Sequence, residues 1–212
     1  MKAPTRISID AAHAPVYHIS DTSSTLDVAA SLLADTATPT PHLTTIIADS
    51  QSAGRGRLGR SWVTPPGQAL LASTIVSLPT SLPTDALGWI LHACALAVRD
   101  ALAERLTPLG HTVTLKWPND VLVDGARKIC GMLAQLAPAS SPFTTTVILG
   151  YGVNIAQQAG TMPTAQATSL YAEGDAAAGE DPTDVSYRLL EAILTGLDAR
   201  IRALIAHGDA AS

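Results

Sequence analysis

Residues 51–62 form the stretch of the chain best suited to bind an anion. The sequence QSAGRGRLGRSW interleaves three glycines with Arg55, Arg57 and Arg60. Glycines let backbone amides approach a ligand closely, and guanidinium groups fork onto phosphate or carboxylate oxygens. The spacing matches neither the Walker loop nor the dinucleotide-binding fingerprint, because a helix must follow each of those. A solvated surface loop is the alternative, and spacing alone does not decide between the two.

A second group of polar residues lies between predicted strands. The motif KWPND runs from Lys116 to Asp120, and a hairpin corner accounts for its Pro-Asn-Asp part but not for its lysine. Lys128 precedes an apolar strand that contains Gly131, and a glycine inside a strand often marks the close approach of a ligand or of another backbone. A single lysine at a strand end is more often solvated than catalytic, so Lys128 alone does not establish a site.

Two further motifs have both a structural and a functional interpretation. Gly150-Tyr-Gly152-Val-Asn154 ends an apolar strand, where the glycines indicate either a bulge or a wall that a ligand approaches. Ser24 and Thr25 fit the start of a helix, where they would also offer hydroxyls to a polar ligand. These residues need a partner motif before they indicate a function.

The composition excludes several classes of protein. Hydrophobic residues make up 47% of the 212 residues and charged residues 15%, a balance typical of a folded domain. The formal net charge of −5, with basic residues clustered locally, favours a small anionic ligand over DNA. No apolar run approaches the roughly 20 residues of a membrane helix, and the N-terminus has no signal-peptide pattern.

The side chains offer no covalent nucleophile and no metal site. Cys94 and Cys130 lie in apolar stretches, the six histidines show no metal-ligand spacing, and no Gly-x-Ser-x-Gly motif is present. A reduced, cytoplasmic protein is therefore expected.

Hydrophobic periodicity and turn residues predict the elements that position these motifs. Strands are expected at residues 17–20, 44–48, 70–78, 112–117, 121–123, 129–136 and 144–150, and helices from Ser24, after Pro83 and from Asp181. Ser24 and Asp27 have the spacing of a capping box, and Gly208 is a suitable end for the last helix. This order predicts one α+β domain over residues 1–212, with a mixed, mostly antiparallel central sheet and flanking helices.

Taken together and in this order, the four motifs resemble the catalytic domain of the biotin protein ligases, the biotin–[biotin carboxyl carrier protein] ligases. The resemblance extends from about residue 22 to about residue 204. It implies the fold shared with lipoate protein ligases and with class II aminoacyl-tRNA synthetases. Leu26 stands where the family usually has Asn, and the turn at residues 124–127 is slightly longer than the family leads us to expect.

The resemblance implies a role for each motif residue. The residues expected at biotin are Ser24, Thr25, Gln51, Arg55, Gly56, Arg57, Lys128, Gly131 and Gly152. The residues expected at the nucleotide are Arg55, Arg57, Arg60, Trp62, Lys116, Asn119 and Asn154. The catalytic residues implied are Lys128, Arg55 and Arg57, with Asp120 as the motif carboxylate nearest to act as a base. No residue is assigned to a metal, since Mg²⁺ is expected to accompany ATP.

The activity implied is ATP-dependent activation of biotin to biotinyl-5′-AMP, followed by its transfer to a lysine of a biotin carboxyl carrier protein domain. The chain stops at Ser212 without the small C-terminal β-barrel usual in the family, and no DNA-binding helical domain precedes the motifs, so no DNA or membrane partner is expected. A homodimer is one assembly that the sequence leaves open.

Two alternatives remain at this point. Lipoate or octanoate ligation uses the same chemistry on a related fold, and Gln51 with the Gly-Arg-Gly-Arg loop favours biotin over it. A non-catalytic adenylate-binding module is the other, and the presence of Lys128 and of all three loop arginines argues against it.

Overall fold

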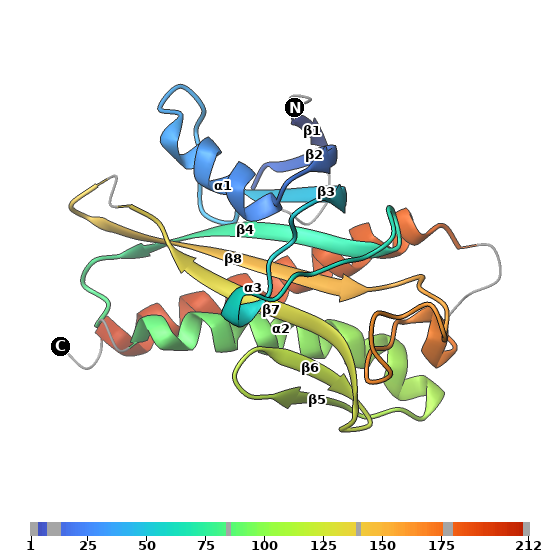
Figure 1. Ribbon diagram of the computed structural model, residues 1–212. Helices are drawn as coiled ribbons and strands as arrows, with labels where there is room; N and C mark the ends of the chain where they lie inside the picture. Colours follow the sequence, from blue (N-terminus) through green and yellow to red (C-terminus); the bar gives the residue numbers. More distant parts are fainter. Residues whose placement is uncertain (1–3, 8–13, 84–85, 139–140, 176–179, 210–212) are drawn as a thin grey trace.

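The architecture is an eight-stranded sheet with helices on both faces (Figure 1). The computed structural model describes residues 4–7, 14–83, 86–138, 141–175 and 180–209. The strands are β1 Thr5–Ile7, β2 Val16–Thr22, β3 Thr45–Gln51, β4 Ala69–Pro79, β5 Val113–Lys116, β6 Asp120–Val123, β7 Arg127–Leu136 and β8 Thr144–Asn154. The main helices are α1 Thr25–Ala34, α2 Leu87–Leu106 and α3 Pro182–Asp209.

The order of the strands in the sheet is β1-β2-β3-β4-β8-β7-β6-β5. Only β2 and β3 run parallel, because α1 connects them; the other neighbours are antiparallel. The prediction of an α+β fold with a mixed, mostly antiparallel sheet is confirmed. Strands β4 and β8 are far apart in sequence, but they pair side by side along their whole length at the centre of the sheet.

Alternation along the strands divides the core into two layers. Ile46, Ile75 and Ile148 belong to a smaller cluster beneath α1. Their direct neighbours Ile47 and Val76 belong to a larger cluster beneath α2 and α3. Successive side chains of a strand point to opposite faces, so both faces of the central strands are buried. This explains why these strands are almost continuously apolar in sequence.

Helices α2 and α3 pack closely together on the larger layer. A Cβ added to Gly196 of α3 would lie 3.5 Å from the Cβ of Ala97 in α2. Small residues at this contact let the two backbones approach, which suits a chain whose core is rich in alanine and poor in aromatic residues. Among the described residues, none of the helices combines the length and apolarity needed to cross a membrane.

The predicted helix ends are partly right. Helix α1 has Ser24 at its N-cap position, but the Ser24 side chain makes no capping hydrogen bond, so the predicted capping box is wrong. The Asp181 carboxylate accepts a hydrogen bond from the Thr183 amide at 2.8 Å, which confirms it as the cap of α3. Helix α3 continues through Gly208 to Asp209, so the expected stop at Gly208 is wrong.

Strand β1 was not anticipated, because its three residues are too short for an alternating pattern to appear. It forms the edge of the sheet beside β2.

The core assignment predicts a contrast between two leucines. Leu102 of α2 is fully buried in the larger layer, whereas Leu109, in the turn after α2, is 47% exposed. Leu102→Ala is expected to lower the free energy of unfolding by about 2–5 kcal/mol, since it leaves a cavity. Leu109→Ala is expected to change it by less than about 1 kcal/mol. Urea denaturation measures both, and equal losses for the two variants would contradict the packing of α2 described here.

Candidate active site

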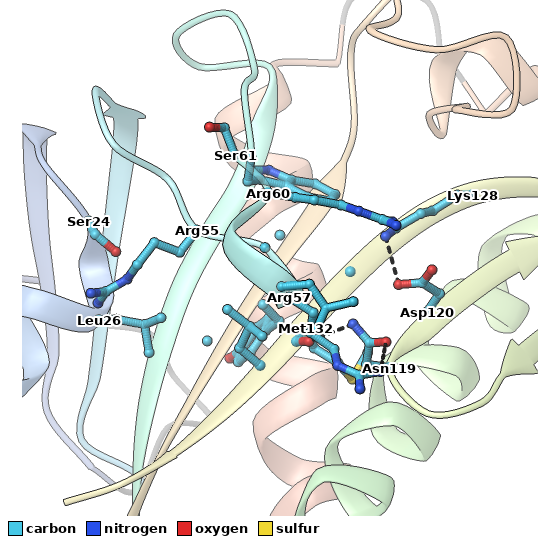
Figure 2. A pocket seen from close by; sticks show the side chains of 18 of the residues that line it. Ser24, Leu26, Arg55, Arg57, Arg60, Ser61, Asn119, Asp120, Lys128 and Met132 are labelled. Carbon is cyan, nitrogen blue, oxygen red and sulfur yellow. Dashed lines mark hydrogen bonds and ion pairs between the residues drawn. The ribbon is translucent and has the colours of Figure 1, made fainter.

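A pocket of about 340 Å³ lies on the α1 side of the sheet (Figure 2). Its position follows from three glycines. Ile148 of β8 packs beneath α1, so Gly150 and Gly152, two and four residues further along, face the same side. Gly131 of β7 is the direct cross-strand partner of Gly152. Because these positions carry no side chains, Trp62 packs directly on Gly131 and Gly152, Leu26 packs on Gly150, and the pocket lies beside them.

The pocket gathers the predicted site residues from all four motifs. Those that line it are Ser24, Thr25, Gln51, Arg55, Gly56, Arg57, Arg60, Trp62, Lys116, Asn119, Asp120, Lys128, Gly131 and Gly152. They come from the start of α1, the end of β3 and the loop after it, the β5–β6 hairpin, β7 and β8. Residues separated by more than a hundred positions therefore meet in one cavity.

Asn154 is the predicted residue that the structure does not bring to the pocket. It is 4% exposed, its Nδ2 donates to the Thr168 carbonyl at 2.8 Å, and its Oδ1 accepts from Gln157 Nε2 at 3.2 Å. Both ends of the amide are thus paired within the chain. In this arrangement Asn154 ties the end of β8 to the segment that follows it.

One end of the pocket is lined by uncharged polar groups. Gln51 Oε1 accepts two hydrogen bonds from Thr25, one from its amide at 2.7 Å and one from its hydroxyl at 3.1 Å. The Ser73 hydroxyl donates to Thr25 Oγ1 at 2.8 Å. These bonds fix the Gln51 amide so that its carbonyl oxygen faces Thr25, and its Nε2 remains as a donor for a ligand.

The other end of the pocket is cationic. Lys128 Nζ forms an ion pair with Asp120 Oδ1 at 2.7 Å, shown dashed in Figure 2. Arg57 Nη1 donates to Asn119 Oδ1 at 3.1 Å, and Asn119 Nδ2 donates to the Met132 carbonyl at 3.0 Å. Among the described lining residues Asp120 is the only acidic one, so positive charge is in excess here. Such a site attracts a carboxylate or a phosphate.

The Trp62 indole lies between the loop and the sheet. A Cβ added to Gly152 would lie 2.6 Å from Trp62 Cε2, and one added to Gly131 would lie 2.9 Å from Trp62 Cζ3. Lys128 Nζ is 5.7 Å from the centre of the indole, within range of a cation–π contact. Trp62 Nε1 is buried and has no hydrogen-bond partner in the described part of the chain.

The arginine-rich loop forms hydrogen bonds within its own backbone. The Trp62 amide donates to the Gly54 carbonyl at 2.8 Å, and the Gly56 amide donates to the Arg60 carbonyl at 2.6 Å. A short 3₁₀ turn, Arg57–Gly59, forms its tip. Arg55 Nη2 pairs with Asp27 Oδ1 at 2.7 Å, which connects the loop to α1.

Sequence reasoning missed three apolar residues of the pocket, Met132, Leu133 and Tyr151. Leu26, noted in the sequence as standing where the family usually has Asn, also lines it. Leu26 packs against Gly150, where an added Cβ would lie 3.0 Å from its side chain. The sequence shows that these residues stand next to motif residues on predicted strands. It does not show which strands are neighbours, so their place in the pocket could not be predicted.

Cys130 and Tyr151 carry a thiol and a phenol near the pocket, and burial keeps both groups protonated, so that neither is a good nucleophile. Burial raises the pKa of the Cys130 thiol well above its usual value. Burial also raises the pKa of the Tyr151 phenol, whose oxygen shares a hydrogen bond with Thr74. Both groups are therefore neutral near pH 7.

The arrangement suits a ligand with an uncharged polar head, an apolar middle and an anionic end. The head of such a ligand would meet Thr25 and Gln51, its middle would meet Leu26, and its anionic end would meet Lys128. The pocket is large enough for a small molecule of this kind.

Comparison with known proteins shows the family to which the chain belongs. Residues 20–154 match the biotin/lipoate A/B protein ligase family. A biotin–[acetyl-CoA-carboxylase] ligase of Mycobacterium tuberculosis is 37% identical over 156 residues, covering 74% of this chain and 53% of that protein. The bifunctional ligase/repressor BirA of Bacillus subtilis is 32% identical over 171 residues, covering 79% of this chain and 49% of that protein. The chain thus spans about half the length of these relatives.

Solved structures share the fold. A biotin protein ligase from Aquifex aeolicus in complex with biotin and ATP superposes with a TM-score of 0.65 at 26% identity, covering 86% of this chain and 70% of that one. A biotin protein ligase from Leishmania major in complex with biotinyl-5-AMP gives a TM-score of 0.66 at 26% identity, covering 91% and 78%.

The contact of Trp62 with Gly131 and Gly152 predicts the effect of adding one methyl group. Gly152→Ala is expected to destabilise the fold by about 1–3 kcal/mol, because its Cβ overlaps the indole. In a Trp62→Ala background the same substitution is expected to cost nothing, since the overlap is gone. Gly88→Ala is the control, because a Cβ at Gly88 meets nothing within 4 Å. Urea denaturation of the four variants measures the cycle, and an equal cost of Gly152→Ala in both backgrounds would mean that the indole lies elsewhere.

Proposed function

Because the chain belongs to the biotin/lipoate A/B protein ligase family, we propose that it is an ATP-dependent biotin protein ligase. In the first step biotin and ATP give biotinyl-5′-AMP and pyrophosphate. In the second step biotin passes to a lysine of a biotin carboxyl carrier protein domain. The observation that carries the proposal is that one pocket contains all but one of the residues expected at biotin, at the nucleotide and in catalysis. The names of the relatives, biotin–[acetyl-CoA-carboxylase] ligases among them, support a carboxylase carrier domain as the acceptor.

The uncharged end of the pocket receives the ureido ring of biotin. Ser24, Thr25 and Gln51 provide hydroxyl and amide groups there, and the hydrogen bonds from Thr25 orient the Gln51 amide before ligand arrives. Leu26 contributes contact area but no hydrogen bond, in a position where the family usually has Asn. The apolar ring and chain of biotin pack on Leu26, which covers Gly150, and on Leu133.

The cationic end carries the adenylation step. An oxygen of the biotin carboxylate attacks the α-phosphorus of ATP, and the bond from that phosphorus to the oxygen of the leaving pyrophosphate breaks. Two anions must approach each other, which costs free energy that nearby cations offset. Lys128 and Arg57 line this part of the pocket and provide that charge. Arg55, which is also expected to act on the reacting groups, pairs with Asp27 of α1 and lies beside Ser24 in Figure 2. The Trp62 ring beside Lys128 excludes water, which strengthens the electrostatic interactions.

Mg²⁺ accompanies ATP and supplies further positive charge to the phosphate oxygens when it is bound. Asp120 is the only carboxylate among the described lining residues, and it is paired with Lys128. The residues present therefore fit a Mg²⁺ ion that is held mainly by the phosphates, with at most one protein carboxylate.

The second step needs a base rather than a nucleophile on the enzyme. The amine of the acceptor lysine attacks the carbonyl carbon of the mixed anhydride, and AMP leaves with the anhydride oxygen. The amine loses a proton in this step, and Asp120 is the carboxylate placed to accept it. Asp120 forms an ion pair with Lys128, so the residue expected to act in the first step and the residue expected to act in the second step are in direct contact.

The two alternatives are less well supported. Lipoate has no ureido group, so the oriented Gln51 amide and the hydroxyls around it would lack their partner. A non-catalytic adenylate-binding module would not require the ammonium of Lys128 beside a carboxylate at 2.7 Å.

The proposed function predicts biotin-dependent exchange of pyrophosphate into ATP. The purified chain with Mg²⁺ is expected to catalyse exchange of labelled pyrophosphate with biotin and not with lipoate, and then to label a carrier domain. Folded protein that shows no exchange with biotin would refute the proposal. Exchange with lipoate alone would support the first alternative.

The mechanism predicts a large effect of Lys128 on rate. Lys128→Ala is expected to slow adenylate formation about a hundredfold, or about 3 kcal/mol, with a much smaller effect on biotin affinity. Lys128→Arg is not expected to restore the full rate, because a planar guanidinium does not replace a compact ammonium. Arg202→Ala, which removes an exposed cation of α3, is the control and is expected to leave the rate unchanged. Single-turnover kinetics with calorimetry of biotin binding measure both quantities, and a wild-type rate for Lys128→Ala would make the lysine a surface residue without a catalytic role.

A further inference from the structure

A network of charged side chains lies behind Lys128, on the far side of the strand from the pocket lining. Its members are His111, Asp124, Arg127 and Glu173, none of which is among the residues that line the pocket. They connect the turn between β6 and β7, and His111 ahead of β5, with the segment that follows β8 and runs beside that turn in Figure 1. The network therefore holds together three segments of the chain.

Arg127 and Glu173 form the centre of the network. Arg127 Nε donates to Glu173 Oε1 at 2.6 Å, and Arg127 Nη2 donates to Glu173 Oε2 at 2.8 Å. This is a two-pronged pair, the strongest geometry for an ion pair between arginine and a carboxylate. The Glu173 side chain is only 6% exposed. Burial acts to raise its pKa, but the hydrogen bonds from Arg127 and Thr168 outweigh burial and lower it, so the group stays ionised.

Asp124 extends the network into the turn before Lys128. Its φ of 51° lies in the left-handed region, which is uncommon for a residue other than glycine. Its carboxylate accepts hydrogen bonds from the Thr112 amide at 2.9 Å, from His111 Nδ1 at 2.9 Å and from Arg127 Nη2 at 2.7 Å. The Thr112 bond, followed by those from His111 and Arg127, holds the pKa of this carboxyl well below its usual range. The turn is thus fixed by charge as well as by backbone geometry.

The segment that follows β8 also forms hydrogen bonds with the backbone of Lys128 itself. The Lys128 amide donates to the Gln166 carbonyl at 2.6 Å, and the Lys128 carbonyl accepts from the Thr168 amide at 2.8 Å. The Thr168 hydroxyl donates to Glu173 Oε1 at 2.6 Å. Glu173 therefore connects to Lys128 by two routes, through Arg127 as its chain neighbour and through Thr168 as its backbone partner.

The cluster is not a site for a metal ion. His111, Asp124 and Glu173 have ligand atoms within 4.8 Å of one another. The Arg127 guanidinium bonds to both carboxylates, however, and already provides the positive charge that a cation would bring.

We propose that Arg127 and Glu173 are positioning residues for Lys128. Their ion pair fixes the backbone on both sides of Lys128, so that its ammonium extends along the pocket to Asp120 and Trp62 rather than into solvent. Neither residue lines the pocket of the candidate active site, and both act through the lysine. The catalytic part of this inference rests on the proposed function, whereas the position of the ammonium does not.

A measurement without substrate tests the position of the ammonium. The sequence has three lysines, Lys2, Lys116 and Lys128, so reductive methylation with ¹³C-formaldehyde gives few signals, which Lys→Arg variants assign. Glu173→Gln keeps the size of the side chain but removes the charge that pairs with Arg127. It is expected to shift the NMR signal of Lys128 and to leave that of Lys116 in place. Glu104→Gln, at an exposed site on α2, is the control and is expected to shift neither. An unchanged Lys128 signal in folded Glu173→Gln protein would overturn the proposal, whether or not the chain ligates biotin.

A kinetic cycle tests the route of action. Glu173→Gln is expected to slow single-turnover adenylate formation about tenfold, with the KM values for biotin and ATP changed less than about twofold. In a Lys128→Ala background, Glu173→Gln is expected to add no further loss, because the group it positions is gone. An equal tenfold loss in both backgrounds would show that Glu173 acts on the fold in general and would refute the positioning role. Arg127→Lys, which keeps the charge but not the fork, is expected to recover only part of the rate lost in Arg127→Met.

Discussion

The glycine pair at the centre of the sheet is the constraint on which the site depends. Gly131 and Gly152 face each other across β7 and β8, and any Cβ at these positions would overlap the Trp62 indole. The fully buried sheet would otherwise fill this face with side chains, as it does beneath α1. Because Gly131 and Gly152 have no side chains, Trp62 of the loop after β3 can pack directly on the backbone of the sheet. The ring then forms one wall of the pocket and a neighbour for Lys128.

The distribution of charge follows from the same geometry. Three loop arginines and Lys128 line a cavity that contains a single carboxylate among its described residues. Two of the arginines have partners within the chain, Arg55 with Asp27 and Arg57 with Asn119. These contacts hold the cations at separate points around the pocket, which lowers their mutual repulsion.

Much of the site was predictable from the sequence, because its chemistry requires particular residue types at short spacings. The Gly-Arg-Gly-Arg loop, the motif ending in Asp120 and the lysine before Gly131 each carry a local signal. Alternation and periodicity likewise predicted most of the strands and the three long helices. A local signal misled at Ser24, which stands at the N-cap of α1 without a side-chain bond to the helix. The expected role of Asn154 at the nucleotide stays a prediction, and in this structure its amide is paired within the chain.

The sequence by itself determined which residues can do chemistry and which segments become strands or helices, since both depend on residue type and short-range periodicity. Only the tertiary structure decided which strands are neighbours, and hence that Gly131 lies opposite Gly152. It also decided that Glu173, 45 positions after Lys128, lies behind that lysine through Arg127 and Thr168. Such pairings depend on how the two faces of the sheet are buried and on where the chain after β8 returns. No local pattern encodes them, because the free energy that fixes them comes from contacts between segments far apart in the chain.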